Sequence, residues 1–225
     1  MGDEAYYWMW GQHPQLSYFD HAPFHAWLQG LVSMVLGWNI FALRALSVLT
    51  TGLTLYILYL WARRLSPGRW KYFFWLSVAL YFSSPLMIFY TTIAIHDRVL
   101  TVLAMLSVHC FAWYFADWAE GRRDRVWPLY LAAFLLGLAT LTKYNGALVG
   151  IGVALAILVR RDLRPLFRNP HLWLAALLSM LMQAPVLYWN LLSGFASLRF
   201  HLVDRPDLFD LGQMSLRNLQ PLLIE

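Results

Sequence analysis

The chain has 225 residues, of which 60% are hydrophobic and only 13% are charged. A soluble domain carries about a quarter charged residues, so this composition excludes an ordinary soluble protein and indicates a membrane protein. The net charge of +5 does not indicate nucleic-acid binding, because the Lys and Arg residues stand in short loops between apolar segments. The single cysteine, Cys110, excludes an internal disulfide.

The apolar segments predict an all-α fold, a polytopic bundle of about six transmembrane helices. A helix that crosses a bilayer needs about 20 apolar residues, and residues 39–61, 72–92, 99–118 and 172–192 meet this length. Residues 127–159 are too long for one span and contain the polar sequence TKYNG at 142–146. They predict two spans joined by a tight turn, in which Gly146 breaks the helix. Residues 23–36 are too short to span and predict an interfacial helix.

The basic residues predict which loops are cytoplasmic, because such loops collect Lys and Arg. Three alternate connections hold 11 of the 17 basic residues, namely Arg63, Arg64, Arg69, Lys71, Arg122, Arg123, Arg125, Arg160, Arg161, Arg164 and Arg168. The N-terminal segment and residues 95–98, 142–146 and 198–210 then share the opposite, non-cytoplasmic face. That face collects most of the acids, namely Asp3, Glu4, Asp20, Asp97, Asp204, Asp207 and Asp210.

Three acids near the N-terminus are candidates for chemistry. Asp3 and Glu4 precede the aromatic run at residues 6–10, a composition typical of a membrane interface. A solvated acidic N-terminus is the simpler interpretation. Asp20 directly precedes the predicted interfacial helix, so a helix N-cap is an alternative role for its carboxylate.

Charged residues at the predicted span boundaries are further candidates, because hydrocarbon penalises a charge by about 2.5–3.5 kcal/mol on insertion scales. His96, Asp97 and Arg98 stand at one boundary, where a plain helix start is the simpler interpretation. Lys143 has no acid within eighteen residues on either side. A lipid phosphate would supply its missing anion, and snorkelling to the interface is the alternative. Arg44 is predicted to pair with an external acid or with a lipid head group.

Six short motifs, in this order and at this spacing, resemble the bacterial GT-C glycosyltransferases, which use polyprenyl-phosphate-linked sugars and are related to protein O-mannosyltransferases and to the lipid A aminoarabinose transferase. The motifs are DEAYYW at 3–8, SYFDHAP at 17–23, ALRALS at 42–47, GLATLTKY at 137–144, PVLYWN at 185–190 and SLRF at 197–200. Each motif is weak alone, and together they span nearly the whole chain.

The resemblance implies that the chain is the N-terminal part of a GT-C fold. It implies sugar transfer from a polyprenyl-phosphate donor to a lipid, glycan or protein acceptor at the periplasmic face of the bacterial inner membrane. It assigns catalysis to Asp3 and Asp20, and contact with the donor phosphate to Lys143, His21 and Arg98. The supporting residues are Glu4, Asp97 and Tyr144.

The sequence contains no P-loop, Rossmann glycine pattern, zinc-ligand spacing or nucleophile elbow. We therefore expect no protein-bound metal and no certain cofactor, with a divalent cation left open. Two alternatives to the enzyme are a transporter that binds lipid phosphate and an inactive fragment or scaffold subunit.

The predicted organisation has three parts: a periplasmic loop with the interfacial helix at 1–38, the transmembrane bundle at 39–192, and a periplasmic segment at 193–225. Related enzymes have a transmembrane helix before the acidic pair and further spans after the region seen here. No signal peptide is evident, and we expect the chain to be a fragment or to have an incorrectly assigned start.

Overall fold

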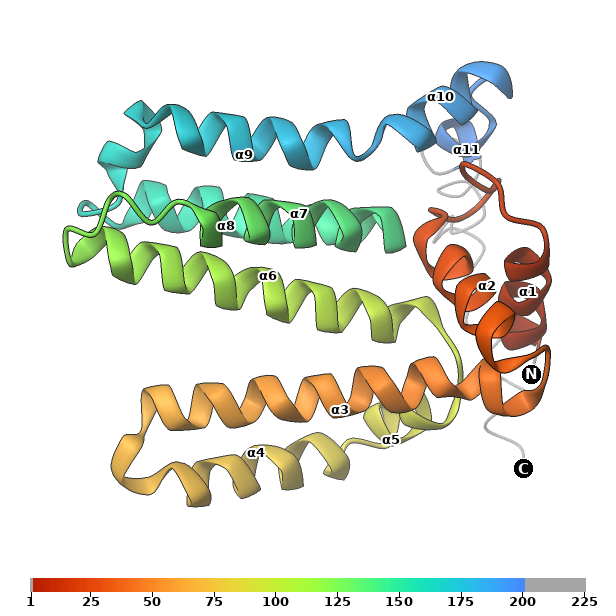
Figure 1. The fold of residues 1–225 in the computed structure, drawn as a ribbon, viewed down its shortest axis with the longest axis horizontal. Coiled ribbons are helices and arrows are strands. Elements are labelled where there is room, and N and C mark those ends of the chain that lie inside the picture. Colours follow the sequence, from red (N-terminus) through yellow and green to blue (C-terminus); the bar gives the residue numbers. More distant parts are fainter. Residues whose placement is uncertain (1, 201–225) are drawn as a thin grey trace, which may run out of the picture.

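The computed structural model describes residues 2–200, apart from the side chain of Asp3, and all regular structure in this part is helical (Figure 1). This confirms the predicted all-α fold. Six helices run roughly along one common axis: α3 (Ile40–Leu65), α4 (Trp70–Ser83), α6 (His96–Ala119), α7 (Trp127–Thr142), α8 (Ala147–Val159) and α9 (Pro170–Leu181). Four other helices gather at one end of this bundle: α1 (Gly2–Gln12), α2 (Phe24–Leu36), α10 (Ala184–Leu192) and α11 (Ala196–Arg199).

Fewer helices meet the length of a membrane span than the sequence predicts. Within the described residues, three are long and apolar enough, namely Ile40–Leu65, His96–Ala119 and the combined Pro170–Leu192. A fourth span exists if the bent pair Pro67–Ser83 and Pro85–Thr92 crosses as one. The helices α7 and α8 are shorter than a span, so the structure does not confirm the predicted six.

Pro85 breaks the predicted span at residues 72–92 into two helices. Its second half is a separate helix, α5 (Pro85–Thr92), which is turned by 81° from the segment before it. Ser84 has an extended backbone (ψ 116°) and Pro85 occupies the first turn of α5. A residue before proline avoids the helical conformation and proline cannot donate a backbone hydrogen bond, so the helix restarts in a new direction.

The turn predicted between α7 and α8 is present as the short 3₁₀ helix η2 (Tyr144–Gly146). Gly146 is buried, and a Cβ atom at this position would lie only 2.5 Å from the backbone carbon of Ala139. The glycine therefore allows the turn to pack directly against α7, and this close approach places Lys143 at the end of the bundle.

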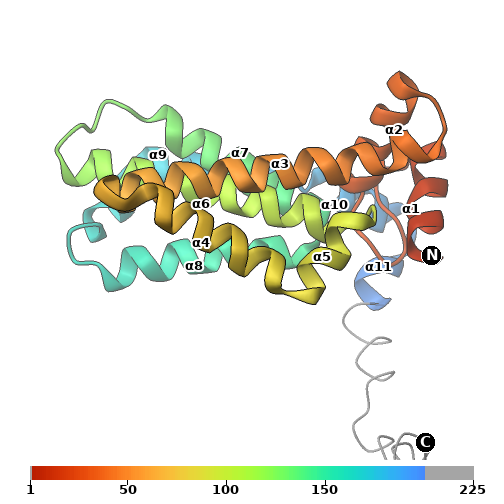
Figure 2. The same cartoon turned by 90° about the horizontal axis from the view of Figure 1, so that it is seen from below.

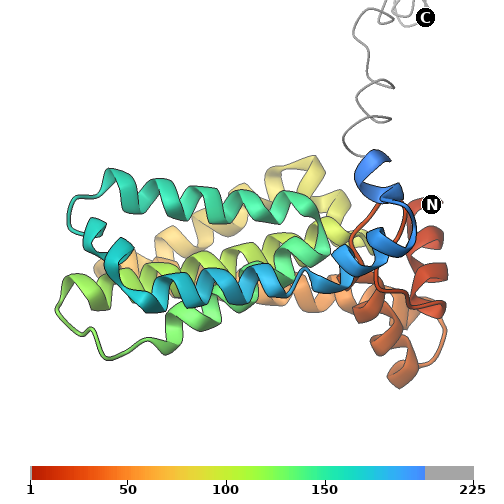
Figure 3. The same cartoon turned by 90° about the horizontal axis from the view of Figure 1, so that it is seen from above.

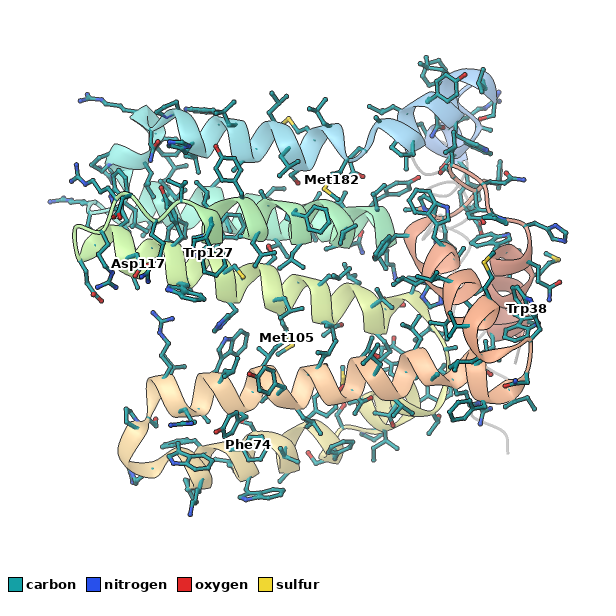
Figure 4. The ribbon with its side chains drawn as sticks, in the orientation of Figure 1. Trp38, Phe74, Met105, Asp117, Trp127 and Met182 are labelled. Atoms are coloured by element: carbon teal, nitrogen blue, oxygen red, sulfur yellow. The ribbon has the colours of Figure 1, made fainter. Side chains whose placement is uncertain are left out.

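The basic loops lie together at one end of the bundle, which we call the arginine end. It is formed by the α3–α4, α6–α7 and α8–α9 connections (Figures 1 and 3). Figure 4 labels Asp117 at this end. Arg122 and Arg125 donate hydrogen bonds to the Asp117 carboxylate. The opposite end, which we call the site end, holds α1, α2, α10 and α11 (Figure 2). The basic loops therefore lie at the opposite end of the bundle from the N-terminal helices, as the charge pattern predicts.

Two hydrophobic clusters stabilise the two ends. The larger one packs α6, α7, α8 and α9 near the arginine end around Tyr114, Leu129 and Ile157. The smaller one lies at the site end and is made by Tyr7, Trp10, Tyr18, Ala26, Ile93 and Ile95. It fixes α1 to α2 and to the α5–α6 connection, and so builds the platform for the polar residues described below.

Part of one prediction falls outside the described residues. The non-cytoplasmic segment predicted at residues 198–210 is described only as far as residue 200. Asp204, Asp207 and Asp210 lie outside the described residues.

Replacing Gly30 by Ala should push α1 away from α2, because a Cβ atom there would meet the carbonyl oxygen of Gly11 at 2.6 Å. We expect a loss of about 1–3 kcal/mol, the usual cost of overpacking, seen as a lower melting temperature in detergent. Gly52→Ala in α3 is the matched control, because nothing lies within 4 Å of its added methyl group. Equal melting temperatures for the two variants would contradict this close contact.

Candidate functional site

The predicted polar residues meet at the site end, where five parts of the chain converge. These are α1, the loop at residues 13–23, the start of α2, the start of α6 and the α7–α8 turn. Asp97 lies at the centre. Its Oδ1 accepts a hydrogen bond from Lys143 Nζ at 2.8 Å, and its Oδ2 lies 3.2 Å from His96 Nε2.

The ion pair with Asp97 corrects the expectation that Lys143 has no anion in the protein. Its partner is 46 residues away in the sequence, so a search among neighbours could not find it. The Lys143 side chain keeps 29% exposure. An ammonium group has three donors, so the contact with Asp97 leaves capacity for a second anion.

Tyr7 organises the aromatic part of the site. Its ring makes edge-to-face contacts with His25 and His96, at centroid distances of 5.2 and 5.1 Å. Its hydroxyl lies 3.3 Å from His21 Nε2, and the His21 ring is 4.6 Å from that of His96. His21 and Lys143, both predicted to face the donor phosphate, therefore each contact one member of the His96–Asp97 pair.

Asp20 does not cap the interfacial helix. The N-cap of α2 is Pro23, with no side-chain hydrogen bond, and Asp20 Oδ1 instead accepts a hydrogen bond from the Tyr6 hydroxyl at 3.0 Å. Burial, together with this hydrogen bond and the charge of Asp20, raises the pKa of Tyr6 to about 12. Tyr6 therefore remains a donor to Asp20 at neutral pH.

Two histidines have buried ring nitrogens without hydrogen-bond partners among the described residues. Both ring nitrogens of His25 are buried without a hydrogen-bond partner among the described residues, and the same holds for His96. The His96–Asp97 contact is close, but it lacks the alignment of a hydrogen bond. Buried polar groups are nearly always paired, so nitrogens of this kind in a cluster with Lys143 indicate a place for a polar ligand.

Glu4 and Asp3 occupy the first turn of α1. Glu4 is buried, and its Oε1 accepts the backbone N–H of Ala94 at 3.0 Å, so it attaches α1 to the α5–α6 connection. Position 3 lies four residues before Tyr7, one helical turn away. The side chain of Asp3 lies outside the described part of the structure.

Arg98 and Tyr144 make other contacts. Arg98 is buried and donates hydrogen bonds to Tyr81 of α4 and Thr51 of α3. Its guanidinium thus joins three helices, in contrast to the phosphate contact predicted for it. The Tyr144 hydroxyl lies 3.2 Å from Ser197 Oγ, which links the α7–α8 turn to α11.

Sequence reasoning missed His25 and Tyr7 as site residues. His25 is a polar residue in the predicted interfacial helix and Tyr7 is one member of the aromatic run at residues 6–10, and neither pattern indicates a site residue. Among the described residues, no group of three or more His, Cys, Asp or Glu side chains is arranged to hold a metal ion.

Acid should destabilise the fold through His25. Burial, with a smaller contribution from His21 and against the opposing charge of Asp97, lowers the pKa of His25 from 6.5 to about 4. The unfolded chain therefore takes up this proton first as the pH falls. Above pH 6.5 His25 has no effect, and between pH 6.5 and 4 the loss grows to on the order of 3 kcal/mol.

Melting temperatures measured across this pH range should fall less in His25→Leu than in the original protein. His13→Leu, which changes an exposed histidine, is the control and should keep the original acid sensitivity. An unchanged pH profile in His25→Leu would contradict the neutral, buried state of His25.

The comparison with known proteins extends the resemblance seen in the sequence. The sequence model of the family described as dolichyl-phosphate-mannose-protein mannosyltransferase matches residues 20–189. The match includes Asp20, His21, Asp97 and Lys143, and begins after α1. No curated protein and no solved structure matches the chain significantly. Because the family model covers most of the chain, the protein belongs to this family of GT-C membrane glycosyltransferases, whose members use polyprenyl-phosphate sugar donors.

Proposed function

We propose that this protein transfers a sugar from a polyprenyl-phosphate-linked donor to a glycolipid, polysaccharide or protein acceptor, with inversion at the anomeric carbon. The observation that supports this most is the cluster of Lys143, Asp97, His96 and His21 at one end of an apolar bundle. A donor with a lipid tail and a charged phosphate needs a polar site at a membrane surface, and the position of this cluster at the end of an apolar bundle supports such a site.

In the proposed step, a hydroxyl oxygen of the acceptor attacks the anomeric carbon as the bond from that carbon to the phosphate oxygen breaks. Asp3 accepts the hydroxyl proton, and polyprenyl phosphate leaves with the bonding electron pair. Asp20 supports the acceptor side, where Tyr6 holds its carboxylate. Lys143 and His21 stabilise the negative charge that develops on the phosphate, and Asp97 positions the Lys143 ammonium group.

An apolar groove beside the cluster suits the lipid tail of the donor. It has a volume of about 480 Å³ and is lined mainly by α7, α8 and α9, with Phe111 of α6 and Phe167 of the α8–α9 connection. It extends from Thr140 and Ala147, which flank the α7–α8 turn, to Trp173 near the arginine end. Its walls are almost entirely apolar. A prenyl chain lying there would leave its phosphate at the α7–α8 turn, where the Lys143 ammonium group has donors to spare.

The proposed location is the inner membrane of a bacterium, with the site end facing the periplasm. The separation of the basic loops from the cluster supports this, because cytoplasmic loops collect Lys and Arg. The position of the polar cluster at one end of the bundle argues against a transporter, because the binding residues of transporters lie near the bilayer midplane. The family supports an enzyme over a scaffold.

Asp3→Asn should lower kcat for sugar transfer by about 10²- to 10⁴-fold, the usual contribution of a positioned general base, with little change in the KM for the donor. The assay uses purified protein in lipid vesicles with polyprenyl-phosphate-linked sugars. Asp124→Asn, at an exposed position of the arginine end, is the matched control. Unchanged turnover in Asp3→Asn would remove this carboxylate from the mechanism, and no transfer by the original protein with any such donor would refute the proposed activity.

Lys143→Gln should lower kcat/KM by about 10²- to 10³-fold, because a cation that meets developing negative charge contributes that much. It should also weaken binding of polyprenyl phosphate lacking a sugar, as measured by a shift in melting temperature. Lys71→Gln, at an exposed position of the arginine end, is the control, and Lys143→Arg should restore part of the loss. Equal binding by Lys143→Gln and the original protein would place the phosphate elsewhere.

A further inference from the structure

A second pocket lies beside α1, between this helix and the α2–α3 junction. It has a volume of about 410 Å³, and its charged lining residues are Glu4 and Arg44. Trp8, Trp38, Ile40 and Leu43 supply most of its apolar walls. Figure 4 places Trp38 at this end of the bundle, beside α1 and α2. The proposed sugar transfer makes no use of this pocket.

Arg44 is the chemically distinctive residue of the pocket. It stands in the second turn of α3, a candidate membrane span, and its side chain is 53% exposed. Its one ionic contact in the described part of the chain joins Nε to Glu4 Oε1 at 3.8 Å, which is too long for a hydrogen bond. The terminal nitrogens of Arg44 donate no hydrogen bond to a described residue, so their donors are open to a ligand.

The walls indicate what kind of ligand this is. Trp8 and Trp38 meet edge to face at 5.0 Å, and tryptophan is enriched where a membrane meets water. Ile40 and Phe41, in the first turn of α3, are each 71% exposed. A guanidinium with free donors therefore lies between an aromatic interface and an apolar surface of a spanning helix.

We propose that this pocket binds the phosphate of an anionic bilayer phospholipid, with the acyl chains lying along the exposed start of α3. A guanidinium binds phosphate with two parallel hydrogen bonds, and the nearby Glu4 carboxylate is buried and bonded to the backbone. The bound lipid would press on α1 through Trp8. This proposal stands apart from the proposed sugar transfer, because none of its residues is shared with the Lys143 cluster.

The test is native mass spectrometry of the purified protein with phosphatidylglycerol, phosphatidylcholine and a polyprenyl monophosphate. We expect one tightly retained phosphatidylglycerol and weaker retention of phosphatidylcholine. Arg44→Gln should weaken phosphatidylglycerol binding by roughly tenfold, the scale of one charge-assisted hydrogen bond. Arg69→Gln, which removes an exposed arginine at the arginine end, is the matched control and should bind as the original protein does.

Trp38→Leu gives a second variant, because it alters the wall of the pocket without removing the partner of the buried Glu4. It should weaken phosphatidylglycerol binding in a protein that keeps its melting temperature. Equal binding by Arg44→Gln, Trp38→Leu and the original protein would overturn the proposal. Displacement of phosphatidylglycerol by polyprenyl phosphate in a protein whose Lys143 is replaced would also overturn it, because the pocket would then belong to the donor.

Discussion

The ion pair between Asp97 and Lys143 is the contact on which the site end depends. Each charge stands at an end of an apolar helix, where an unpaired ion is costly. The 2.8 Å contact joins the start of α6 to the α7–α8 turn, and it brings His96 beside Lys143. Because Asp97 satisfies only part of the ammonium group, the pair that holds the helices together also leaves donors for the phosphate contact that we propose.

The attachment of α1 is the second requirement, since this helix holds the proposed base. Three kinds of contact fix it: the Glu4–Ala94 hydrogen bond, the direct backbone approach of Gly11 and Gly30, and the packing of Tyr7 among the histidines. Glu4, Tyr7 and Gly11 follow the i, i+3, i+7 spacing, so all three contacts use one face of a helix of only 11 residues. A change in any of them is therefore expected to reach the position of Asp3.

Two adjacent sides of α1, about 100° apart around the helix, face different chemical environments. The Tyr7 side meets the histidines and the Asp97–Lys143 pair, and the Trp8 side lines the pocket of Arg44. Both sides lie at the same end of the bundle, where a membrane surface is expected. A bound phospholipid on one side and a sugar donor on the other would act on one short helix, which offers a physical route by which the surrounding bilayer affects the site.

The sequence by itself determined the membrane class, the all-α fold, the separation of basic loops from acidic motifs, and the family. These follow from composition, apolar length and motif order, which are local properties. Only the tertiary structure decided which groups meet. In the structure Lys143 pairs with Asp97, and Asp20 accepts a hydrogen bond from Tyr6 instead of capping a helix. His25 and Tyr7 join the site, and Arg98 bonds to side chains of α3 and α4. Such contacts join residues far apart in the chain, and helix packing alone brings them within reach.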